Sequence, residues 1–136
     1  MAYHLRDHTA DVAVEATGVT LGETFAAVAD GMAAAMCDDV PGAGDRFEVR
    51  VAAESREALL FDYLDELIYR RDVDAVLPVD NEAVVETVDG EWRVAASARG
   101  VPLERVSARE IKAVTYSEMD LSETDDGWHA YVVLDV

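Results

Sequence analysis

Two stretches of alternating side chains, one near each end of the sequence, constrain the fold most. Residues 11–16 alternate between apolar side chains on one face and Asp11, an alanine and a glutamate on the other. Residues 128–135 alternate in the same way and end on Asp135. A period of two is typical of a half-buried strand. If the two strands are neighbours, the carboxylates of Asp11 and Asp135 and the terminal carboxylate of Val136 converge at one edge.

Length and composition indicate one globular domain spanning residues 1–136. Apolar residues make up 51% of the 136 residues, which is enough to build a core and argues against disorder. We find no apolar run of membrane-spanning length and no positively charged start followed by an apolar block, so we expect neither a membrane span nor a signal peptide. The single cysteine, Cys37, excludes an internal disulfide and fits a reducing compartment, so we expect a cytoplasmic protein.

The charge restricts the classes of partner. The chain has 29 acidic and 11 basic residues and a formal net charge of −18. Such a surface repels phosphate backbones, so we expect no direct tight binding of nucleic acid. Abundant acids with almost no lysine are typical of a halophilic protein, in which salt screens the repulsion. We therefore expect folding that depends on high salt.

Two helices are expected from capping signals followed by apolar stripes. Thr20 and Glu23 form a capping box before a helix that runs to about Cys37. Ser55 can cap a second helix. The apolar residues of each helix recur at helical spacing. The first stripe contains Leu21, Phe25, Val28, Ala29, Met32 and Met36, and the second Leu60, Tyr63, Leu64, Leu67 and Ile68.

The remaining chain is expected to form strands. Asp89-Gly90 is a strong hairpin signal, because both residues tolerate positive φ. Further strands are predicted at 47–52, 82–88, 91–100, 111–117 and 119–123. The sequence thus predicts an α+β fold in which two helices pack on a largely antiparallel sheet as a two-layer sandwich.

The chemistry available to the chain is mainly that of carboxylates. We find no Gly-rich phosphate loop and no Cys/His spacing suited to zinc. Cys37, at the end of an apolar helix, is interpreted as inert core. His8, beside a threonine, is interpreted as either a structural hydrogen-bonding group or a functional one. Asp11, Asp135 and the terminal carboxylate are hard ligands that suit Ca²⁺ or Mg²⁺.

Lys112 is the only lysine, since the other ten basic residues are arginines. It lies in the predicted strand 111–117, where a charge needs a partner. Two interpretations stay open at this point. Lys112 is either a mobile point charge with a functional role or a stem lying over the sheet with its head in water.

Five segments together resemble the archease family nearly from end to end. The opening His-Thr-Ala-Asp and the Lys-Ala-Val-Thr-Tyr segment are specific in combination. The segments are His8–Val12, Leu21–Ala29, Ala58–Phe61, Ile111–Tyr116 and Leu134–Val136.

The resemblance implies a small α+β protein that is not itself an enzyme. Archeases assist the GTP-dependent RNA-splicing ligase that joins tRNA halves. They promote guanylylation of the ligase's active-site histidine, allow multiple turnover and can broaden nucleotide use. Calcium is the implied ion, bound by Asp11, Asp135 and the backbone of Val136. Lys112 matches the family lysine, and Lys112 and His8 would contact the partner or its nucleotide site.

The chain departs from the family pattern in two places. The segment Leu103–Glu110 is shortened and lacks a histidine often found there, and Ser117 stands where histidine is common. Two rival functions remain. One is a metal-dependent hydrolase that uses the Asp11/Asp135 site, although no positioned base or nucleophile accompanies these carboxylates. The other is a chaperone for a tRNA-modifying enzyme such as a tRNA methyltransferase.

Overall fold

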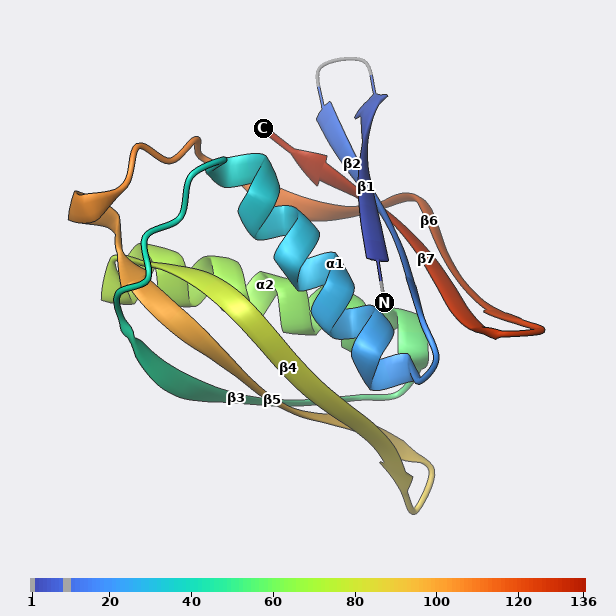
Figure 1. Ribbon diagram of the computed structural model, residues 1–136. Helices are drawn as coiled ribbons and strands as arrows, with labels where there is room; N and C mark the ends of the chain where they lie inside the picture. Colours follow the sequence, from blue (N-terminus) through green and yellow to red (C-terminus); the bar gives the residue numbers. More distant parts are fainter. Residues whose placement is uncertain (1, 9–10) are drawn as a thin grey trace.

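The strands divide into two antiparallel sheets, and both helices pack against strands of both sheets (Figure 1). The computed structural model describes residues 2–8 and 11–136, with residues 6–8 described as backbone only. One sheet has the order β1-β2-β7-β6 and the other β3-β5-β4. The elements are β1 (Ala2–His8), β2 (Asp11–Gly18), α1 (Leu21–Met36), β3 (Asp45–Ala53), α2 (Arg56–Asp74), β4 (Val76–Val88), β5 (Glu91–Pro102), the 3₁₀ helix η1 (Leu103–Arg105), β6 (Ala113–Thr124) and β7 (Gly127–Asp135).

The α+β class with two helices and antiparallel strands is confirmed. The number of sheets differs from the expectation, since we expected a single sheet and the described strands form two. The helices therefore lie between two sheets. This arrangement explains why α1 is buried on nearly all its sides, beyond its expected apolar stripe.

The helix signals act as the sequence indicates. The Glu23 amide donates to the Thr20 hydroxyl at 3.1 Å, and the Glu23 carboxylate accepts from the Thr20 amide at 3.4 Å. The Ala58 amide donates to the Ser55 hydroxyl at 3.1 Å. Every residue of the two expected stripes is buried. Gly22 lets α1 approach the backbone of β4 at Ala83 so closely that a Cβ would collide with it.

The strands differ from expectation where a bulge interrupts pairing. β4 begins at Val76, and its register with β5 shifts between Val79 and Glu82. At this bulge the Asn81 amide and side chain both donate to the Asp30 carboxylate of α1, at 3.0 and 2.9 Å. Burial raises the pKa of Asp30, although the hydrogen bonds from Asn81 oppose the rise.

The two short strands predicted at 111–117 and 119–123 are one strand, β6, with a register shift between Thr115 and Asp120. Glu118 has a φ of 58° within this irregularity. The hairpin prediction is confirmed, because Asp89 and Gly90 have φ values of 53° and 81° between β4 and β5. None of the helices in the described part of the chain is both long and apolar enough to cross a membrane.

Candidate functional site

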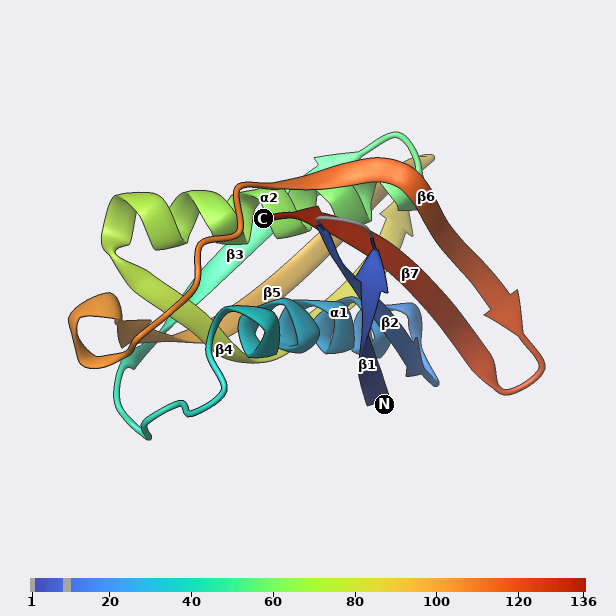
Figure 2. The ribbon, with the colours of Figure 1, turned by 90° about the horizontal axis from the view of Figure 1, so that it is seen from above.

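The pairing of β2 with β7 brings the two ends of the chain together. Val12 pairs with Leu134, the last pair of this ladder, and extending the antiparallel register by one position would bring Asp11 opposite Asp135. Residues directly opposite in such a pair present their side chains on the same face. Asp135 is exposed and Asp11 is half-buried. Figures 1 and 2 both show the C-terminus beside the start of β2. The expectation that the two strands are neighbours is therefore confirmed, and the convergence of the carboxylates stays a prediction.

Lys112 lies at the same end of the sheet, but outside the strand in which we expected it. β6 begins at Ala113, which pairs with Asp135. The Lys112 amide donates to the Asp135 carbonyl at 2.8 Å, which fixes the backbone of both residues. The side chain is exposed and, within the described part of the chain, forms no ion pair. The interpretation of Lys112 as a strand-centre charge was wrong, because the strand starts one residue later.

The donor chemistry fits a hard divalent cation. Two carboxylates from opposed strand positions and the backbone of half-buried Val136 provide only oxygen ligands, as Ca²⁺ and Mg²⁺ prefer. Among the residues that the structure describes, no cluster of three or more His, Cys, Asp or Glu side chains is placed to hold a metal. Three protein groups do not fill the six to eight positions typical of Ca²⁺, so water or a partner must complete the shell.

The other residues of the expected motif are described only in part. The backbone of His8 ends β1 and pairs with Asp11, whereas the His8 side chain and the whole of Thr9 and Ala10 lie outside the described residues. The position of the His8 imidazole relative to the carboxylates thus stays a prediction. Cys37 is buried, as expected, and its thiol donates to the Asp39 carbonyl at 3.3 Å.

A polar cluster on the four-stranded sheet was missed by sequence reasoning. The His129 ring lies between two carboxylates, with Nε2 3.0 Å from Glu15 and Nδ1 3.1 Å from Asp120. The Glu15 hydrogen bond raises the pKa of His129, burial opposes the rise, and Asp120 adds to it. The three residues come from β2, β7 and β6, so only the register across three strands brings them together. The alternation that puts Glu15 on the face of Asp11 was the only signal available.

A comparison with protein-family models decides the family. The model of the archease protein family matches residues 3–136. The chain belongs to the archease family. It is 36% identical over 142 residues to the archease of Methanosarcina barkeri, covering 98% of this chain and 95% of that protein. It is also 36% identical over 136 residues to the archease of Thermococcus gammatolerans, covering 96% and 95%.

Solved structures confirm the archease fold. The solution structure of Methanobacterium thermoautotrophicum protein 1598 matches with a TM-score of 0.85 and 29% identity, covering 99% of both chains. A Thermotoga maritima crystal structure, described as an archease and possible chaperone, matches with a TM-score of 0.65 and 22% identity over 98% of both chains, which shows the fold alone.

Proposed function

We propose that this archease is a protein cofactor that activates the GTP-dependent RNA-splicing ligase. It would promote guanylylation of the ligase's active-site histidine, sustain multiple turnover and broaden nucleotide use. The observation that supports the proposal is the β2–β7 pairing, in which Val12 pairs with Leu134 at the end of the sheet where Asp11, Asp135 and Lys112 lie. Family membership supports the class of function.

The proposed site has two parts, which are a set of oxygen ligands for a metal ion and the positively charged side chain of Lys112. Asp11, Asp135 and the Val136 backbone would hold a divalent cation, which we take to be calcium. When bound, the ion supplies positive charge beside a triphosphate and its leaving pyrophosphate. Lys112, a compact charge on a flexible stem, would meet a phosphate or a ligase carboxylate. His8 would contact the partner or its nucleotide from the end of β1.

The net charge of −18 supports a protein as the working partner and disfavours RNA. We place the protein in the cytoplasm, where the buried Cys37 thiol stays reduced. We also infer a halophilic source from the excess of acids. A second candidate, a chaperone for a tRNA-modifying enzyme such as a methyltransferase, is favoured by the description of the Thermotoga maritima protein as a possible chaperone. Co-purification with a methyltransferase in place of the ligase would favour this candidate.

A multiple-turnover ligation assay tests the proposal. The ligase from the same organism is mixed with excess RNA halves and GTP, with and without archease. Wild-type archease should convert a stalled ligase into one that makes many products per enzyme. Lys112→Ala, with its fold and metal binding verified, should not. Arg50→Ala is the matched control, because Arg50 is exposed on β3 and forms no ion pair within the described residues.

The wild-type and Lys112→Ala measurements test the cofactor function and the role of Lys112 separately. If wild-type archease leaves the turnover of its own ligase unchanged, the cofactor function is wrong. If Lys112→Ala stimulates as fully as wild type, the cofactor function stands and the proposed role of Lys112 is wrong.

A further inference from the structure

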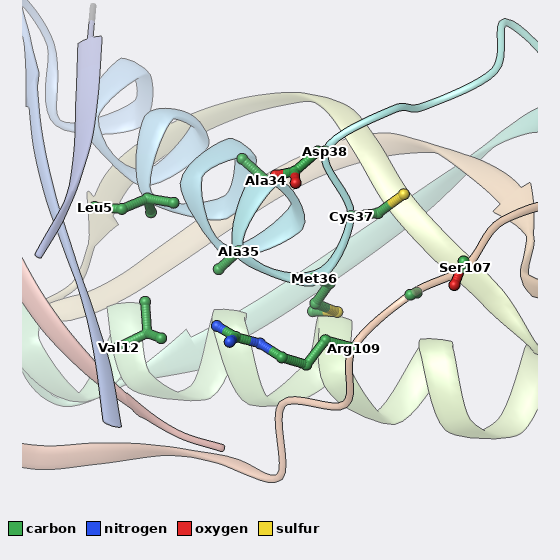
Figure 3. A pocket seen from close by; sticks show the side chains of 10 residues that line it. Leu5, Val12, Ala34, Ala35, Met36, Cys37, Asp38, Ser107 and Arg109 are labelled. Carbon is green, nitrogen blue, oxygen red and sulfur yellow. The ribbon is translucent and has the colours of Figure 1, made fainter. Parts of the chain in front are cut away.

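A pocket of about 570 Å³ lies beside the candidate site, between the C-terminal end of α1, the β1–β2 hairpin and the segment 107–109 (Figure 3). Its wall is more polar than apolar, and the apolar side chains in it include Leu5, Val12 and Ala35. The Arg109 amide donates to the Met36 carbonyl at 2.6 Å, which fixes the segment against the end of α1. The pocket is thus built from three parts of the chain that the fold holds together.

Arg109 provides the positive charge of this pocket. Its side chain reaches across the pocket toward Val12 and Ala35 (Figure 3). Within the described part of the chain it forms no ion pair or side-chain hydrogen bond. By contrast, Arg70, Arg71 and Arg99 lie within 4 Å of an acidic partner. In a chain with 29 acidic residues, a guanidinium without an acidic partner in the described structure is available to an outside anion, and the side chains of Val12 and Ala35 lie beside it.

The surroundings favour a carboxylate over a phosphate. The C-terminal end of α1 carries the negative end of the helix dipole and lies in the pocket wall together with Asp38. Both oppose a multiply charged phosphate group. The pocket lining contains no aromatic ring on which a base could stack. A single carboxylate fits the planar fork of Arg109 bidentately, and an adjacent apolar side chain fits the wall.

We propose that this pocket docks a peptide segment of the partner protein that carries an apolar side chain next to an Asp or Glu. The apolar side chain would pack between Leu5, Val12 and Ala35, and the carboxylate would pair with Arg109. The inference rests on the proposed function in so far as the partner is a protein. Val12 follows Asp11 and Arg109 precedes Lys112 by three residues, so a docked segment holds the partner beside the candidate cation site.

Calorimetric binding of the full chain to the ligase tests the docking pocket. Arg109→Gln should weaken binding about ten- to a hundredfold, the loss typical of removing a charge-assisted hydrogen bond at an interface. Ala35→Leu, which fills the pocket from a half-buried position, should weaken binding comparably. Arg50→Gln, on β3, should bind as wild type does. Circular dichroism and amide spectra verify the fold of each variant.

Four outcomes overturn the inference. If both pocket variants bind the ligase as wild type does, the docking site is wrong while the proposed function stands. If wild type itself does not bind, both are wrong. If GTP alone shifts the amide resonances of residues 34–38 and Arg109→Gln abolishes the shift, the occupant is a phosphate. If wild type self-associates and Arg109→Gln does not, the occupant is a second copy of the chain.

Discussion

Arg56 connects the two sheets through the only two tryptophans of the chain. Its guanidinium carbon lies 5.0 Å from the ring centroid of Trp128 and 5.9 Å from that of Trp92. Trp128 belongs to β7 in one sheet and Trp92 to β5 in the other. Arg56 is the first residue of α2. Replacing it with alanine therefore removes a contact that both sheets share.

The loss of unfolding free energy expected for Arg56→Ala can be estimated from the two cation–π distances. A partly exposed cation–π contact contributes about 0.5–1 kcal/mol, and the contact at 5.9 Å lies near the limit of the interaction. The two contacts together thus contribute about 1–1.5 kcal/mol. A positive charge at a helix N-terminus is unfavourable by about 0.3–1 kcal/mol, and the substitution relieves this. With the lost packing of the stem, the net destabilisation should be about 1 kcal/mol, or about 3–5 °C in melting temperature.

Thermal unfolding followed by tryptophan fluorescence measures this effect directly, because both fluorophores are the contacted rings. The spectrum of folded Arg56→Ala should also differ from that of wild type. Arg50→Ala, an exposed arginine without an ion pair in the described structure, should change stability by no more than about 0.5 kcal/mol. An Arg56→Ala protein with the spectrum and melting temperature of wild type would refute the proposed connection between the sheets.

Two further predictions concern the four-stranded sheet and its strand ends. Asp11→Ala should abolish ligase activation but lower the melting temperature far less than Leu64→Ala does. Leu64→Ala removes a fully buried side chain, at a cost of about 2–5 kcal/mol in the free energy of unfolding. Equal losses of stability in the two variants would show that Asp11 is structural. The raised pKa of His129 means that its ion pairs stabilise the fold fully below about pH 6.5 and lose that effect as pH rises through the folded pKa. From pH 6 to 9, wild type should therefore lose stability relative to His129→Gln, and parallel pH profiles would contradict this.

Local signals predicted the elements well. The capping box at Thr20, the cap at Ser55 and the Asp89-Gly90 turn act through atoms a few residues apart, so the sequence suffices to identify them. The bulge in β4 depends on Asn81 bonding to Asp30, 51 residues away, and no local pattern encodes such a pairing. The division into two sheets also depends on long-range pairing.

The candidate site was predictable only in the part that depends on local sequence patterns. Alternation places Asp11 at the start of one strand and Asp135 at the end of another, and only the pairing of these strands had to be assumed. The pairing is present, but Lys112 lies before β6 because the strand begins at Ala113. The Arg109 pocket could not be predicted, because it is formed by the hairpin, the end of α1 and an irregular segment that meet only in the folded chain.

We expect the ends of strands β2 and β7 to bind a divalent cation. Calorimetric titration of Ca²⁺ into wild type and Asp135→Asn measures this binding, and Asp135 is suited to substitution because its side chain is exposed. Wild type should bind one ion with modest affinity, since three protein groups leave part of the shell to water or a partner. Asp135→Asn should show a clearly weaker isotherm. Identical isotherms for the two proteins would contradict the claim.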